Sequence, residues 1–123
     1  MELVQRALDD FNAGEIGSNF EAAFDPAIEF RDELGELDNR DDLIEYLHGF
    51  REALVGLHVE VGDVRDLAET LLFVVTQEGR GTASGANVGQ QFTWVMTFRD
   101  GRCVRWHIFA DHNRALRLAG LDE

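Results

Sequence analysis

Residues 90–111, with the sequence QQFTWVMTFRDGRCVRWHIFAD, decide the predicted fold. Apolar and polar residues alternate on both sides of Asp100-Gly101, a strong signal for a two-residue hairpin turn. The pattern predicts two antiparallel strands whose faces both carry apolar side chains. We therefore expect one face to line the interior of the protein and the other to pack against a second copy of the chain, as a homodimer.

The turn also predicts which residues of the hairpin share a face. Counting outward from Asp100-Gly101 places Trp94 opposite His107 and Gln90 opposite Asp111. Cys103, the only cysteine of the chain, is expected to be buried on the same face. The side chains predicted to line an inner pocket are those of Gln90, Phe92, Trp94, Met96, Arg105, His107, Phe109 and Asp111.

The rest of the chain predicts an α+β protein with a curved antiparallel sheet, N-terminal helices and a short C-terminal helix. Helical periodicity is found at 3–14, 19–24, 41–54 and 111–119. Strand patterns are found at 27–32, 58–65 and 70–84, with a polar loop at 33–40. We expect residues 1–123 to form one domain in which the helices and the sheet enclose an apolar pocket.

Composition limits the expected partners and compartment. There are 24 acidic residues against 11 basic ones, and the net charge of −13 repels phosphates and anionic lipid head groups. We therefore expect no nucleic acid and no membrane partner. A lone cysteine and the lack of a long apolar stretch suggest a cytoplasmic protein without a signal peptide or a membrane-spanning helix.

Metal and cofactor motifs are missing from the sequence. No H-E-x-x-H pattern occurs, and the acidic run 38–42 lacks the glycine of a calcium loop. The glycines of 79–85 do not have the spacing of a dinucleotide-binding fingerprint. We expect neither a metal nor a cofactor.

Several short motifs together resemble the SnoaL-like family of nuclear-transport-factor-2-like proteins over essentially the whole chain. They are Phe11-Asn12-Ala13-Gly14, Asp25-Pro26, the stretch 79–85, Phe98-Arg99-Asp100-Gly101-Arg102 and Phe109-Ala110-Asp111. The resemblance implies a cone-shaped α+β fold with a strongly bent sheet, usually dimeric through that sheet, around an apolar pocket. Members of the family include polyketide cyclases, steroid isomerases, epoxide hydrolases and proteins with no known activity, so the fold does not select one function.

Asp111 is the first candidate for catalysis. Its position resembles that of the aspartate that polyketide cyclases of this family use as acid/base catalyst, and aromatic neighbours would surround it. Asp111 also directly precedes a predicted helix, where aspartate is a preferred N-cap. Both roles remain open from the sequence.

His107 is the second catalytic candidate. At about 3.3 Å per strand residue it lies roughly 13 Å from Asp111, so the two cannot form a dyad. The two side chains could contact opposite ends of one ligand, or His107 could be a buried histidine that is hydrogen-bonded to a neighbouring residue. Arg105 could lie at the pocket mouth or pair with an acid, and Gln90 could orient Asp111.

These candidates suggest a cofactor-free acid/base isomerase or cyclase acting on a small apolar carbonyl compound. The alternatives are a non-catalytic domain that binds a small apolar molecule, and a structural dimer. An epoxide hydrolase is less expected, because no second aspartate is predicted on the inner face.

Overall fold

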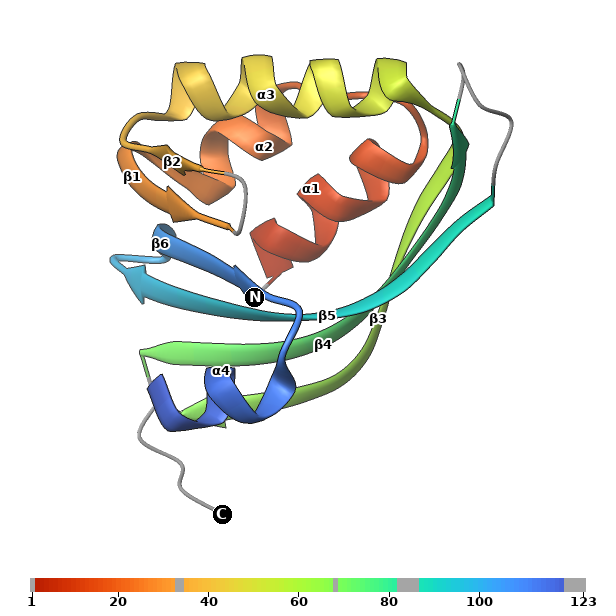
Figure 1. Ribbon diagram of the computed structural model, residues 1–123. Helices are drawn as coiled ribbons and strands as arrows, with labels where there is room; N and C mark the ends of the chain where they lie inside the picture. The colour runs from red at the N-terminus through yellow and green to blue at the C-terminus, as the bar shows by residue number, and fades with distance from the viewer. Residues whose placement is uncertain (1, 33–34, 68, 82–86, 119–123) are drawn as a thin grey trace.

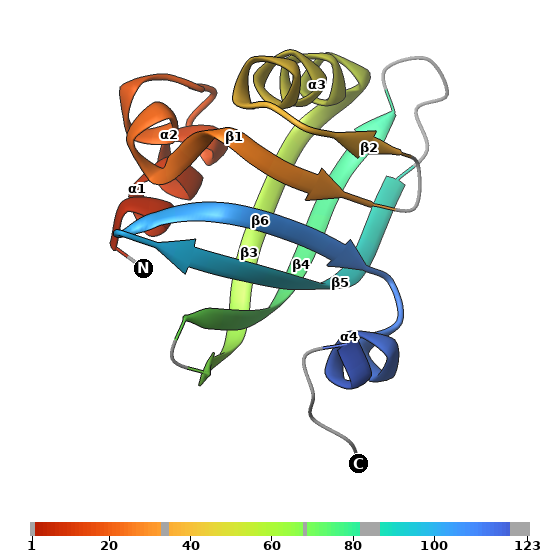
Figure 2. The same ribbon diagram turned by 90° about the vertical axis from the view of Figure 1, so that its left-hand side faces the viewer.

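Three helices cover the concave side of one strongly curved sheet, and a short fourth helix lies against its other side (Figures 1 and 2). The computed structural model describes residues 2–32, 35–67, 69–81 and 87–118. The helices are α1 (Glu2–Asn12), α2 (Ser18–Ala23), α3 (Arg40–Ala53) and α4 (His112–Leu118). The strands are β1 (Phe24–Arg31), β2 (Glu36–Leu37), β3 (Leu54–Leu67), β4 (Thr70–Gly81), β5 (Asn87–Arg99) and β6 (Arg102–Phe109).

The predicted α+β class, with a curved sheet between N-terminal helices and a short C-terminal helix, is confirmed. The strand order is β2-β1-β6-β5-β4-β3, and the meander from β3 to β6 is antiparallel as expected. Two pairings differ from the prediction. β1 pairs with β6 in parallel, and β2 forms within the expected loop at 33–40. The predicted ends of a strand at 82–84 and of the last helix at 119 lie outside the described residues.

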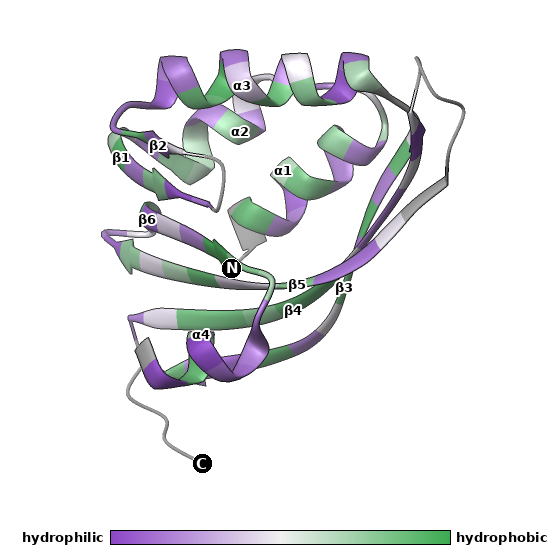
Figure 3. Cartoon of the chain, in the orientation of Figure 1, coloured by the Kyte–Doolittle hydropathy of each residue, from purple (hydrophilic) through white to green (hydrophobic). Residues whose placement is uncertain are grey.

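The core lies between α1 and the concave face of the sheet. Val4, Ala7, Leu8 and Phe11 recur along one side of α1, and all are buried. Figure 3 shows hydrophobic and hydrophilic positions alternating along α1. No helix in the described part of the chain is long and apolar enough to span a membrane.

The side chain of Asn12 joins the end of α1 to the sheet. Its Nδ2 donates to the carbonyl oxygen of Val59 at 2.8 Å, and its Oδ1 accepts from the amide of Val59 at 2.9 Å. Val59 pairs in regular register with Gln77 of β4, and β3 is the last strand of the described sheet. The side-chain amide of Asn12 therefore pairs with the backbone groups of Val59 on the open edge of β3.

The hairpin of β5 and β6 contains a β-bulge that changes the predicted register. Asp100 and Gly101 have φ angles of 53° and 80°, as the predicted turn requires. Phe98 pairs with Cys103, but the next residue along β5, Thr97, pairs with Arg105, so Val104 is an extra residue. The register predicted beyond this point is wrong by one residue, because counting from a turn assumes an uninterrupted ladder.

The bulge reverses the face of every β6 side chain after Val104. Met96 is opposite Trp106 and Trp94 is opposite Ile108, so Trp106 and Ile108 face the helices. Arg105 and His107, which were expected inside, lie on the outer face.

The outer face of the sheet is partly covered by α4. Leu72, Ala115 and Leu116 are buried, although none belongs to the main hydrophobic cluster. Thr93, buried on the same face, is hydrogen-bonded to His112 at the start of α4 at 2.9 Å. This helix hides part of the apolar surface from which a homodimer was inferred, and the homodimer stays a prediction.

Replacing Asn12 with alanine should lower the free energy of unfolding by about 1 to 3 kcal/mol, because both backbone groups of Val59 lose their partner. Urea denaturation would measure the change. Gln5→Ala is the control, since Gln5 is exposed and its side chain donates to the exposed Asp9 on the same helix, and it should shift stability by less than about 0.5 kcal/mol. Equal effects of the two substitutions would contradict the joining role of Asn12.

Deleting Val104 should prevent cooperative folding. Removal of the extra residue would turn Arg105 and His107 toward the apolar core, where unpaired charges are strongly disfavoured. Val104→Ala keeps the residue count and therefore the bulge, so it should still melt in one transition. Thermal unfolding followed by circular dichroism distinguishes the two variants, and a sharp transition in the deletion variant would show that the bulge does not fix the register.

Candidate functional site

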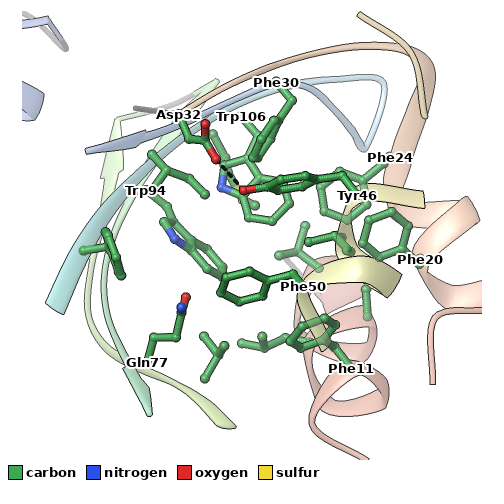
Figure 4. Close-up of a pocket in the computed structure, with 18 of the residues that line it drawn as sticks. Phe11, Phe20, Phe24, Phe30, Asp32, Tyr46, Phe50, Gln77, Trp94 and Trp106 are labelled. Carbon is green, nitrogen blue, oxygen red and sulfur yellow. Dashed lines mark hydrogen bonds between the residues drawn. The ribbon is translucent and has the colours of Figure 1, made fainter. Parts of the chain in front are cut away.

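A cavity of 290 Å³ lies between the concave face of the sheet and helices α1, α2 and α3 (Figure 4). This volume is near the lower end of the range for small-molecule sites. Every strand except β2 contributes to the lining, and most of the contributed side chains are apolar. The cavity is therefore suited to a small and largely apolar molecule.

Aromatic rings form one wall of the cavity, with Trp106 at their centre. The Trp106 ring lies 5.5 Å from the ring of Phe24, 5.1 Å from Phe30 and 4.9 Å from Trp94, between centroids. Phe20 stacks on Phe24 at 4.4 Å. Edge-to-face and offset contacts of this kind hold the rings in fixed orientations, which gives the wall a defined shape.

A carboxylate and a phenol meet at one end of this apolar space. Asp32 directly follows β1, and Tyr46 projects from α3. The Tyr46 hydroxyl donates to Oδ2 of Asp32 at 2.8 Å, and the amide of Gly35 donates to Oδ1 at 2.8 Å. Figure 4 shows this pair, joined by a dashed line, beside the rings of Trp106 and Phe30.

The Tyr46 hydroxyl remains a proton donor over the whole physiological range. Partial burial, and next the hydrogen bond to Asp32 with the charge of that carboxylate, raise the pKa of Tyr46 to about 12. The site therefore presents a neutral phenol beside an acceptor carboxylate.

Two glutamines form a second polar region. Gln77 of β4 pairs directly with Gln90 of β5, and both line the cavity. Gln77 is half-buried and Gln90 is exposed, so this end reaches solvent. In Figure 4 Gln77 lies on the opposite side of the cavity from Asp32 and Tyr46.

The two tryptophans of the wall keep unused hydrogen-bond donors. Nε1 of Trp94 and Nε1 of Trp106 are buried, and neither has a hydrogen-bond partner in the described part of the chain. A buried donor without an acceptor costs about 1 to 3 kcal/mol. An oxygen atom that reached either nitrogen would remove that cost.

The structure brings together four of the residues predicted from the hairpin. Gln90, Phe92, Trp94 and Met96 lie in the lining of the cavity. All four belong to β5, whose facing follows from simple alternation along one strand and is independent of the bulge in β6.

The other predicted residues lie outside the cavity. His107 Nε2 is hydrogen-bonded to Glu29 Oε2 at 3.0 Å, and Arg105 Nε contacts the same oxygen at 2.9 Å. Phe109, on the same outer face, lies 6.2 Å from the His107 ring in an edge-on arrangement. Placing Arg105, His107 and Phe109 on the inner face was an error that follows from the bulge at Val104.

Asp111 caps the final helix. Its side chain is exposed, and Oδ1 accepts from the amide of Arg114 at 3.2 Å. It does not line the cavity, whose last contribution from this segment is Ala110. Of the two roles left open by the sequence, the structure places Asp111 in the N-cap role.

The sequence contained a signal for the residues that were missed. Ile28 and Phe30 alternate inward along β1, and Asp32 continues that alternation. Tyr46 lies one helical turn before Phe50 on α3, and both line the cavity. Trp106 could be placed only with knowledge of the bulge.

Metal and thiol chemistry find little support in the described residues. Within them, no group of three or more His, Cys, Asp or Glu side chains is placed to hold a metal ion. Cys103 is fully buried, and burial raises the pKa of its thiol to about 12. A thiol with that pKa is a core side chain and not a nucleophile.

Comparison with known proteins agrees with the fold. Residues 4–106 match the SnoaL-like domain. A nuclear-transport-factor-2-like protein of unknown function from Burkholderia pseudomallei has a TM-score of 0.80 at 17% identity, covering 96% of this chain and 95% of that one. A proposed SnoaL-like polyketide cyclase from Jannaschia has a TM-score of 0.79 at 17% identity, covering 99% of this chain and 91% of that one.

A third structure of the same shape is that of a proposed polyketide cyclase from Streptomyces antibioticus. Its TM-score is 0.78 at 14% identity, with 97% of this chain and 96% of that chain covered. No protein of curated function is detectably similar in sequence. At these identities the likeness concerns the fold and not the activity.

The ion cluster around Glu29 should make stability depend on pH. The hydrogen bond with His107 and the charges of Arg105 and Arg31 hold the pKa of Glu29 below its ordinary value of 4.5, against the opposite effect of burial. A lowered pKa in the folded state contributes stability above the unfolded value, and that contribution disappears as the pH falls through the folded value. The free energy of unfolding of wild type should therefore be larger than that of Glu29→Gln at about pH 6. This difference in stability should disappear below about pH 4.

Urea denaturation at several pH values would measure this gap. Glu36→Gln is the matched control, because Glu36 is largely exposed and its Oε1 lies 3.8 Å from Nε of Arg31. A gap for Glu29→Gln that is constant from acid to neutral pH would disprove the linkage.

Proposed function

Since this chain belongs to the SnoaL-like domain family, we propose that it binds a small, mostly apolar carbonyl compound in its cavity and performs cofactor-free acid/base chemistry on it. The observation that carries the proposal is the Asp32 carboxylate, hydrogen-bonded to Tyr46 at one end of a mostly apolar cavity. Isomerisation and aldol-type cyclisation are the reaction types that such a site fits.

The reaction would begin with proton transfer to Asp32. An oxygen of its carboxylate removes a proton from the carbon next to the ligand carbonyl, and the electron pair of the broken C–H bond moves to the carbonyl oxygen as an enolate. The same carboxyl group then returns the proton to another carbon in an isomerisation. The aromatic wall keeps water from the enolate during its lifetime.

Tyr46 would orient the carboxylate of Asp32. Its hydroxyl, whose raised pKa keeps it protonated, donates to the carboxylate before reaction. A ligand oxygen placed nearby could take over that hydrogen bond as negative charge moves from the carboxylate to the ligand, which stabilises the enolate.

A non-catalytic binding domain is the second candidate. Both carboxylate oxygens of Asp32 already accept a hydrogen bond, one from Tyr46 and one from the turn amide of Gly35. A carboxylate held in this way could serve only to order the turn and to accept a hydroxyl group of a ligand.

Deuterium exchange next to a carbonyl group would test the catalytic proposal directly. We expect the protein to accelerate the uptake of deuterium from heavy water into at least one member of a panel of aryl and cyclic ketones, followed by proton NMR. Asp32→Asn should reduce this rate by at least about a hundredfold, because it removes the proton acceptor and keeps the shape. Tyr46→Phe should reduce it less, since the carboxylate remains.

Asp38→Asn is the control for a change of surface charge, since Asp38 is exposed and bonds to Arg31. It should leave the exchange rate unchanged. If Asp32→Asn exchanges as fast as wild type, Asp32 is not the base. If ketones bind but none exchanges, the protein is a binding domain.

A further inference from the structure

We propose that Gln77 and Gln90 form a second polar anchor, and that the ligand is a neutral, elongated, mostly aromatic molecule with an oxygen function at each end. A hydroxyl group would bond to Asp32 and a hydroxyl or carbonyl group to the glutamines. This inference rests on the proposed use of the cavity as a binding site, but it does not require catalysis.

The side-chain amides of the two glutamines line the cavity and are available to a ligand. They face each other across β4 and β5 and share the inner face with Val75, Phe92 and Trp94. Neither side-chain amide forms a hydrogen bond with another described residue. Gln90 is exposed and Gln77 is half-buried, so water satisfies both amides in the free protein, and the polar end of a ligand would take the place of that water.

The glutamine anchor is far from Asp32. Arg31 pairs with His107, which places Asp32 level with Ile108, and Ile108 pairs with Trp94. Gln90 lies four residues from Trp94 along β5. At about 3.3 Å per residue, this offset along the strand is about 13 Å. Because the side chains at both ends reach into the cavity, a ligand that contacts both must hold its polar groups on the order of 10 Å apart.

Charge determines which polar groups the ligand can carry. Among the described residues that line the cavity, Asp32 is the only one with a formal charge, and none of them is a Lys, Arg or His that could pair with an anion. The net charge of −13 adds to the repulsion of anionic ligands. A neutral amide both donates and accepts, so the glutamine end accommodates a hydroxyl or a carbonyl group.

Two rigid probe molecules distinguish a cavity with one polar anchor from a cavity with two. para,para′-Biphenol carries a hydroxyl group at each end, whereas para-phenylphenol carries one, and their aromatic bodies are the same. We expect calorimetric titration to show that wild type binds the diol about three- to tenfold more tightly, the effect of one additional hydrogen bond. In Gln77→Leu and in Gln90→Ala, the affinities for the two probes should become nearly equal. The affinity for para-phenylphenol should stay close to that of wild type.

Gln91→Ala is the matched control. Gln91 is the neighbour of Gln90 in β5, is exposed, and does not line the cavity, since successive strand residues face opposite sides. This variant should keep the full preference for the diol. Melting temperatures of the three variants verify that each is folded.

The outcomes separate this inference from the proposed function. If wild type binds both probes with equal affinity, the second anchor is overturned. The same holds if the preference for the diol is unchanged in Gln77→Leu and Gln90→Ala. Neither result affects the catalytic proposal. Failure of both probes to bind overturns the proposed ligand class. A preference lost in both glutamine variants and kept in Gln91→Ala supports the two-ended ligand even if no ketone exchanges deuterium.

Discussion

The extra residue at Val104 in β6 is the constraint on which the cavity depends. Pairing resumes one residue out of step after it, so Trp106 and Ile108 enter the interior while Arg105 and His107 leave it. Trp106 then contacts Phe24, Phe30 and Trp94 and forms the centre of the aromatic wall. Without the bulge, two basic side chains would occupy that space, and an apolar cavity could not form.

The charged side chains removed from the interior form a cluster on the outer face. Glu29 contacts Arg31, Arg105 and His107, and these groups lie on the neighbouring strands β1 and β6. β1 and β6 are far apart in sequence and pair in parallel, a connection with no local turn to define it. Charge complementarity on one face and packing of Phe30 against Trp106 on the other therefore act together to hold this pairing.

The interior combines a fixed apolar wall with polar groups that are only partly satisfied. Asp32 and Tyr46 are hydrogen-bonded to each other at one end, whereas the buried indole nitrogens of Trp94 and Trp106 have no hydrogen-bond partner in the described part of the chain. Unsatisfied groups lower the stability of the protein alone and favour a ligand that supplies the missing partners. Such an arrangement is typical of a site that is shaped for binding before the ligand arrives.

Local patterns in the sequence determined the fold class, the hairpin turn and the facing of β5. The alternation from Gln90 to Met96 and the conformational demands of Asp100-Gly101 act within a few residues, so they can be read along the chain. Only the tertiary structure decided the facing of β6, the parallel pairing with β1 and the meeting of Asp32 with Tyr46. A bulge preserves the local alternation of side chains and changes only their phase, and that phase is set by packing against strands and helices that are distant in sequence.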